Sequence, residues 1–160
     1  MENTITNKET ENLILSKGPK GKRYIMKLAE GQYLGYPKNT DPEKEENMII
    51  VDNENDAVLI NRSTKSLAED GYYTWAFYPH GDKKKGKRID YRLRNGFRRI
   101  FGNNNDSLAV SWKPEHENGG KFYAVAPKVP EALHPRLGNK GENLIAAAKG
   151  GYEIELIERK

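Results

Sequence analysis

Short runs of β-branched and aromatic residues recur along the chain between turn-rich segments, and this pattern limits the possible fold more than any other feature. Ten such runs follow one another: RYIM, QYLGY, MIIV, AVLI, YYTWAFY, IDYRLR, RRIF, LAVSW, KFYAVA and YEIELI. Short strands at such spacing indicate an all-β sandwich or barrel. No long window has the 3.6-residue period of a helix, and only NLIAAA (143–148) is compatible with a helical turn.

Two twelve-residue stretches align without a gap and indicate an internal repeat. YIMKLAEGQYLG (24–35) matches YRLRNGFRRIFG (91–102), and a looser third copy spans residues 123–138. A strand that carries an aromatic residue follows each copy, which gives a period of about 40 residues. These aromatic residues are Trp75, Trp112 and Tyr152.

The segments RYIMKLAEGQYLGY, YYTWAFYPHG and IDYRLRNGFRRIFG resemble those of ricin-B-type proteins of the β-trefoil superfamily. In that fold three four-strand units close a barrel and cap it with hairpins. The resemblance implies one β-trefoil domain over residues 20–160, built from three pseudo-repeats of about 40 residues, after a flexible segment over residues 1–19. The expected core consists of Met26, Leu34, Trp75, Leu93, Phe101, Trp112, Val125, Leu137 and Ile154.

Composition and motifs exclude several classes of chemistry. The 160 residues include no cysteine, so disulfide frameworks, thiolate nucleophiles and cysteine-based zinc sites are excluded. No Gly-x-Ser-x-Gly elbow, Walker A loop or dinucleotide-binding glycine motif occurs. The histidines at 80, 116 and 134 lie in separate loops without the spacing of paired metal ligands. We therefore expect no catalytic residues, metal or cofactor, and a protein that is not an enzyme.

The N-terminal stretch carries acids and amides where a secretory signal needs a basic region followed by a long apolar one. No apolar run approaches the roughly 20 residues of a membrane-spanning helix. We expect a protein without a membrane span that is cytoplasmic as synthesised, and non-conventional release stays open. The sequence does not determine the oligomeric state.

Sugar binding requires an aromatic face for stacking and amide or carboxylate groups that bond to hydroxyls. Three loop clusters have this composition, the third of them beside Trp112. The repeat ends read YTW, VSW and GYE where ricin-type domains carry Gln-x-Trp. The first expected function is therefore a non-enzymatic, lectin-like module that binds a glycan. The candidate residues are Tyr36, Asn39 and Asp41; Tyr78, His80 and Asp82; and Asn103, Asn104 and Asp106.

A second expected function comes from another branch of the superfamily. KRYIMKLAEGQYLGYPKN is similar to the opening repeat of fungal mycocypin-like protease inhibitors, which are cysteine-free β-trefoils that push loops into protease clefts. The Pro-containing segments 36–47 and 126–143 suit this use, because a stiffened loop loses less entropy on binding. A target protease is then the expected partner.

A third possibility concerns the basic stretch KKKGKRIDYRLRNGFRR (83–99). Clustered Lys and Arg suit sulfate or phosphate groups, whereas no RNA-binding fingerprint appears, so an anionic glycan is favoured over nucleic acid. For its hairpin we expect a four-residue connection from Asn95 to Arg98, which would bury Leu93 opposite Ile100. The candidate residues are Lys83, Lys84, Lys85, Lys87, Arg88, Arg92, Arg94 and Arg99.

Overall fold

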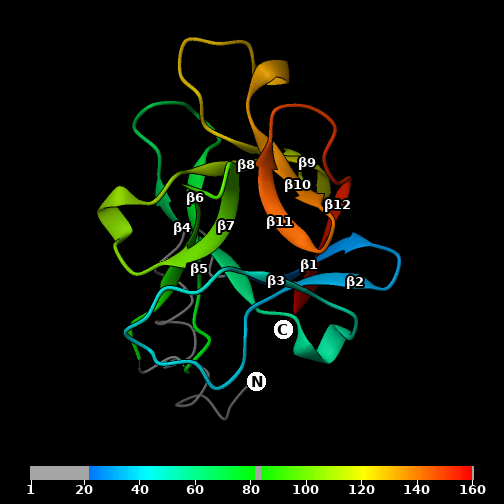
Figure 1. Ribbon diagram of the computed structural model, residues 1–160. Coiled ribbons are helices and arrows are strands. Elements are labelled where there is room, and N and C mark those ends of the chain that lie inside the picture. Colours follow the sequence, from blue (N-terminus) through cyan, green and yellow to red (C-terminus); the bar gives the residue numbers. More distant parts are fainter. Residues whose placement is uncertain (1–21, 82–83, 160) are drawn as a thin grey trace, which may run out of the picture.

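Twelve antiparallel strands and no α-helix make up the described part of the chain, which confirms the predicted all-β class (Figure 1). The computed structural model describes residues 22–81 and 84–159. Its strands are β1 (Arg23–Ala29), β2 (Gln32–Gly35), β3 (Ile49–Val51), β4 (Ile60–Lys65), β5 (Tyr73–Phe77), β6 (Lys87–Arg94), β7 (Phe97–Asn103), β8 (Trp112–His116), β9 (Gly119–Ala124), β10 (Arg136–Lys140), β11 (Asn143–Ala147) and β12 (Ile154–Arg159). Three 3₁₀ turns join them: η1 (Glu54–Asp56), η2 (Asp106–Leu108) and η3 (Glu131–Leu133).

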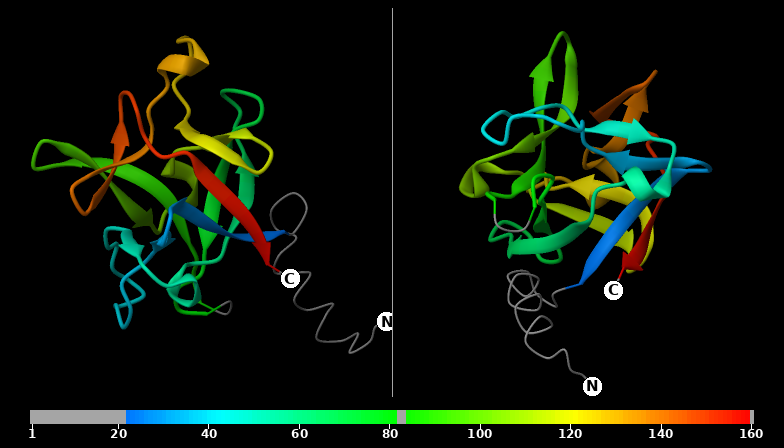
Figure 2. Two further views of the ribbon diagram at one scale, coloured as in Figure 1. Left: turned by 90° about the vertical axis from the view of Figure 1, so that its right-hand side faces the viewer. Right: turned by 90° about the horizontal axis from the view of Figure 1, so that it is seen from below.

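Six of the strands pair in a closed ring. β1 pairs with β4, β4 with β5, β5 with β8, β8 with β9, β9 with β12, and β12 with β1. Figure 2 shows the last of these contacts, with blue β1 beside red β12 near the C-terminus. Closure leaves no free edge on these strands, which protects them from pairing with other chains.

The other six strands form three hairpins, β2–β3, β6–β7 and β10–β11. Each hairpin is attached to the ring through the strand that precedes it, by the pairs β1–β2, β5–β6 and β9–β10. The hairpins also contact one another, because β7 pairs with β11 and with Asn47, which lies in the connection between β2 and β3. Each set of four consecutive strands therefore pairs in the same way.

The predicted repeat alignment is wrong in its details. Residues 24–35 form a ring strand and a hairpin strand, whereas residues 91–102 form both strands of a hairpin. The first strands of the three sets begin at Arg23, Tyr73 and Gly119, so the first two sets are longer than the predicted 40 residues. The two stretches match without a gap because each consists of two adjacent antiparallel strands. Side chains alternate with a two-residue period in every such pair, so the match does not show that the two pairs occupy equivalent places in the fold.

The core lies inside the ring and under the hairpins, and aromatic residues dominate its centre. The Trp112 ring stacks on Phe122 at 5.1 Å between centroids, and Trp75 meets Phe122 edge-on at 5.5 Å. Both indole N–H groups are paired: Trp75 donates to the Trp112 carbonyl and Trp112 donates to that of Ile89. Most of the predicted core residues are buried, although Val125 is only partly so.

Leu93 is the clear exception, because 72% of its surface is exposed. Asn95 and Gly96 both have positive φ, 51° and 83°, and form a two-residue turn in which Leu93 pairs with Arg98. The predicted four-residue connection is therefore wrong. Two consecutive positive φ values match the twist of a hairpin, and Asn-Gly adopts them readily. The tip extends past the core, so burial exerts no force on its register.

Two further predictions concern local structure. The segment NLIAAA forms strand β11 rather than a helical turn, since Leu144 and Ala146 alternate into the core. The predicted flexible segment over residues 1–19 lies outside the described residues. Within the described ranges, no helix has the length and apolar character needed to cross a membrane.

Candidate functional site

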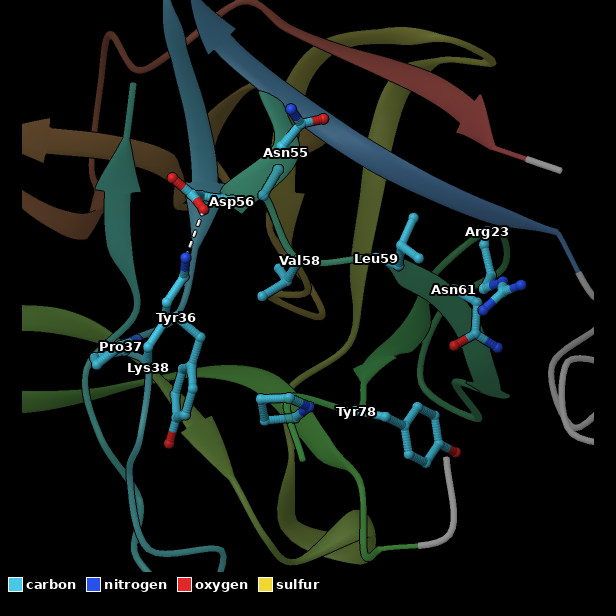
Figure 3. Close-up of a pocket in the computed structure, with 12 residues that line it drawn as sticks. Arg23, Tyr36, Pro37, Lys38, Asn55, Asp56, Val58, Leu59, Asn61 and Tyr78 are labelled. Carbon is cyan, nitrogen blue, oxygen red and sulfur yellow. Dashed lines mark hydrogen bonds and ion pairs between the residues drawn. The ribbon is translucent and has the colours of Figure 1, made fainter. Parts of the chain in front are cut away.

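Tyr36 and Tyr78, which the sequence placed in two separate candidate clusters, line the same surface hollow (Figure 3). The hollow has a volume of about 280 Å³ and lies where the ends of β2 and β5 meet the connection from η1 to β4. Its lining residues are Arg23, Tyr36, Pro37, Lys38, Asn55, Asp56, Ala57, Val58, Leu59, Asn61, Tyr78 and Pro79.

The two tyrosines have different roles in this hollow. Tyr36 is only 4% exposed, since its ring packs on Phe77 at 5.3 Å and its hydroxyl oxygen accepts the N–H of Glu46 at 2.9 Å. Burial raises the pKa of Tyr36 above its ordinary value. Tyr78 is half-buried, so it is the aromatic ring that a ligand can reach.

Gly86 positions Tyr78. A Cβ atom at Gly86 would lie 2.5 Å from the Tyr78 ring, so only a glycine allows the ring to pack against the backbone there. Gly86 belongs to the basic stretch (83–99), so this stretch supports the wall of the hollow that Tyr78 forms. Close approach of a side chain to the backbone is a recurrent use of glycine.

Polar groups from several segments line the hollow that contains the Tyr78 ring. In Figure 3, Lys38 and Asp56 lie on one side and are joined at 2.6 Å, while Arg23, Asn61 and Tyr78 lie on the other. Val58 and Leu59 separate the two sides. The hollow therefore presents amide, carboxylate and cationic groups beside an aromatic and aliphatic surface.

Turn η1 brings two of these groups into place. The side-chain oxygen of Asn53 accepts the N–H of Asn55 at 2.9 Å and caps the turn, which carries Asn55 and Asp56. Asn61 is the second residue of β4, and its amide donates to the carbonyl of Arg62. The sequence analysis missed Lys38, Asn55, Asp56 and Asn61. No local sequence pattern indicates which polar residues of separate connections line a common hollow.

Of the other residues in the first two predicted clusters, Asn39, Asp41 and His80 do not line the hollow. Asp41 accepts the N–H of Glu43 at 2.9 Å, and Asn39 has φ of 59°, as expected in a turn. The Thr40 hydroxyl lies 3.2 Å from Nε2 of His80 and joins the two loops. Asp82 lies outside the described residues.

The third predicted cluster lacks its aromatic partner. Trp112 is fully buried, and Asn103 is also buried, where its amide donates to the carboxylate of Asp90 at 2.8 Å. Asn104 and Asp106 line a second, shallow hollow of about 390 Å³ together with Lys85, Gly86, Arg88 and Asn105. Among the described residues, no aromatic ring lines this second hollow, so they offer no surface there for stacking on a sugar.

Lys87 belongs to the interior rather than to an exposed basic patch, which corrects the prediction for this residue. Its side chain is fully buried, and its ammonium donates to the carbonyls of Pro42 and Lys44 and to the side chain of Asn104, at 3.2, 2.7 and 2.6 Å. Burial lowers the pKa of Lys87 from its ordinary value. The lysine thereby ties the segment between β2 and β3 to the β6–β7 hairpin.

Two arginines of the basic stretch are also paired within the chain. Arg88 meets Asp106 at 2.9 Å, and Arg92 donates to the Glu45 carbonyl at 3.1 Å with its guanidinium 3.6 Å from the Glu45 carboxylate. Lys84, Lys85 and Arg94 are exposed, Arg99 is half-buried, and Lys83 lies outside the described residues. The eight predicted cations thus do not form one continuous patch.

The described residues contain no group of three His, Asp or Glu side chains placed to hold a metal ion. His134 is fully buried and His80 partly buried, while His116 is exposed. Comparison with known proteins adds no assignment: neither a protein-family model, nor a curated protein, nor a solved structure matches the chain.

Proposed function

We propose that the chain is a β-trefoil whose hollow at Tyr78 binds a carbohydrate, as a non-enzymatic, lectin-like module. The closed ring of six strands and the three attached hairpins support the fold, because each set of four strands repeats the same pairing. The resemblance to ricin-B-type repeats points in the same direction.

One observation carries the binding proposal: a reachable aromatic ring shares one hollow with amide and carboxylate groups that come from separate segments. Tyr78 offers an apolar face for the C–H surface of a sugar ring. Asp56 accepts from hydroxyl groups, and Asn55 and Asn61 have amides that both donate and accept.

The size of the hollow suggests what it would hold. Its volume of about 280 Å³ lies at the lower end of the range for small-molecule sites. One sugar ring fits this size, with the rest of a glycan extending into solvent. The Lys38–Asp56 pair would act as a fixed polar wall, since each group already holds the other in place.

Glycan-array binding followed by calorimetry tests the proposal. Tyr78→Ala should strongly weaken binding of whichever glycan the array identifies, whereas Tyr33→Ala, a tyrosine truncation on β2 outside the hollow, should leave it unchanged. Asp56→Asn should weaken binding more than Asp52→Asn, which changes a carboxylate outside the hollow. Equal effects of the paired variants, or an array without a selective signal, would contradict this function.

A second candidate, protein binding of the protease-inhibitor type, rests on the loop over residues 125–135. It stands above the rest of the chain in Figure 1 and again in the left view of Figure 2. Its exposed side chains include Val129 and Leu133, at 43% and 66% exposure. A projecting apolar tip is a feature that a protein partner can bind.

The loop is held from below by buried groups. His134 Nδ1 lies 2.6 Å from the Tyr72 hydroxyl and Nε2 lies 2.9 Å from the Val129 carbonyl. Because a carbonyl only accepts, the Nε2–H of His134 donates to the Val129 carbonyl, and the other ring nitrogen is bonded to the Tyr72 hydroxyl. Arg136 donates to three carbonyls around the base of the loop. Such a fixed shape reduces the entropy lost on binding.

Residual-activity assays against cysteine and serine proteases test this second candidate. Inhibition should reach completion near one-to-one stoichiometry and disappear in Leu133→Ser. Leu108→Ser, an equally exposed leucine in η2, serves as the control, since Leu108 is 73% exposed and lies outside this loop. Undiminished activity of every protease in the panel would exclude this candidate.

A further inference from the structure

Three buried side-chain polar atoms among the described residues have no hydrogen-bond partner, and all lie on or beside the β6–β7 hairpin. They are Nε of Arg92, Nε of Arg99 and Oδ1 of Asn47. Arg92 lies directly opposite Arg99 in the strand register, and Asn47 pairs with Phe101 on the same strand as Arg99. An unpaired buried polar group destabilises the folded state, so the concentration of three such groups at one place needs an explanation.

The two arginines are also an unfavourable pair of charges. Residues directly opposite in a hairpin have Cβ atoms about 5 Å apart, and like charges at this distance destabilise it. Arg92 has the Glu45 carboxylate as a counter-charge at 3.6 Å. No carboxylate of the described residues pairs with Arg99.

Two more cations share this surface. Arg94 lies two residues from Arg92 and therefore on the same face of β6. Its partner in the register is Phe97, and the Lys140 ammonium lies over the Phe97 ring at 5.0 Å. Arg92, Arg94, Arg99 and Lys140 are called the arginine face below, and they come from two hairpins, β6–β7 and β10–β11.

We propose that the arginine face binds a tetrahedral oxyanion, the sulfate group of a sulfated glycan. A guanidinium offers two parallel N–H groups to two oxygens of such a group, and a shared anion would offset the repulsion between Arg92 and Arg99. Both side chains keep part of their surface exposed, so a bound anion can draw each guanidinium outward and give its Nε–H the acceptor that it lacks. This site is separate from the Tyr78 hollow and does not depend on it.

The chemistry of the face favours a glycan over nucleic acid. Single-stranded nucleic acids gain much of their affinity from bases stacked on open aromatic rings. Here the Lys140 ammonium covers a face of Phe97, and Phe101 is buried under the Arg92 guanidinium at 4.1 Å. The surface offers clustered cations without a stacking platform, which matches a sulfated chain.

Calorimetric titration with a heparin octasaccharide and its fully desulfated counterpart tests the inference. The sulfated form should bind and the desulfated form should not. Arg99→Gln should weaken binding about tenfold, the effect of losing a charge-assisted hydrogen bond. Arg98→Gln removes the same charge from the neighbouring residue, which faces the opposite side of β7, and should change affinity less than about threefold.

Arg94→Gln, which alters an exposed side chain, provides a second reading if Arg99→Gln does not fold. It should weaken binding of the sulfated octasaccharide more than Arg98→Gln does. Binding that survives desulfation overturns the proposal. If Arg98→Gln loses as much affinity for the sulfated octasaccharide as Arg99→Gln and Arg94→Gln do, binding depends only on net charge, and the proposal is overturned. Equal affinity for a single-stranded oligouridylate of matched charge overturns it as well.

Discussion

The ammonium nitrogen of Lys87 lies 2.7 Å from the carbonyl oxygen of Lys44, which joins the start of the β6–β7 hairpin to the segment that follows β2. Arg92 and Asn104 add contacts to Glu45 and Glu43 in the same segment. The most basic stretch of the chain therefore serves in part to hold an acidic segment, and only its remaining cations are available to a partner.

Replacement of Lys87 by Met should lower the free energy of unfolding by about 2–3 kcal/mol, because it leaves the Pro42 and Lys44 carbonyls and the Asn104 side chain without their donor. Lys85→Met, an exposed neighbour, should change it by less than about 0.5 kcal/mol. Urea unfolding measures both variants. A similar small change in both would show that the buried contacts of Lys87 contribute nothing.

Asp90 should make stability depend on pH. Burial raises the pKa of its carboxyl group above the ordinary 3.8, against the opposing hydrogen bonds from Asn103 and the Tyr91 N–H. Between 3.8 and the raised value the folded state binds more protons than the unfolded state, so this group's contribution to stability falls as pH rises through that window.

The measurement is urea unfolding of the wild type and Asp90→Asn from pH 3 to 8. The advantage of the wild type over the variant should be largest at the acidic end, decrease through the window, and stay constant above the raised pKa. A difference between the two proteins that does not vary with pH would contradict the role assigned to this carboxyl group.

Two leucine truncations test the register of the β6–β7 hairpin. Leu93→Ala should leave the free energy of unfolding within about 0.5 kcal/mol of the wild type, because the side chain is 72% exposed. Leu34→Ala removes the same atoms from a fully buried side chain and should cost about 2–5 kcal/mol. If Leu93→Ala proves equally costly, the longer connection expected from the sequence is the correct one.

Gly86→Ala should displace Tyr78, since the added Cβ would lie 2.5 Å from its ring. Under the proposed carbohydrate function, glycan affinity should fall while thermal stability changes modestly. The double variant Gly86→Ala, Tyr78→Ala should bind no worse than Tyr78→Ala alone, because the glycine acts only through the ring. A further loss in the double variant would give Gly86 a separate contact with the ligand. Calorimetry with the array-selected glycan distinguishes these outcomes.

The sequence alone indicated the all-β class and most of the strands, because alternation of apolar residues is a local property that any window of a few residues reveals. It also indicated Tyr36 and Tyr78 as candidates, since each is an aromatic residue with amide or carboxylate residues close by in the sequence. The sequence did not indicate which strands belong to the ring and which to the attached hairpins, because both have the same two-residue period.

Only the tertiary structure decided which charged residues face inward and which polar groups line the same hollow as Tyr78. Lys87 is buried because a segment 43 residues away supplies its acceptors, and Asp56 reaches Lys38 across 18 residues. Such contacts exist only after the ring of strands closes and brings the connections together. Local alternation therefore determined the strands of this protein, and long-range closure determined its surfaces.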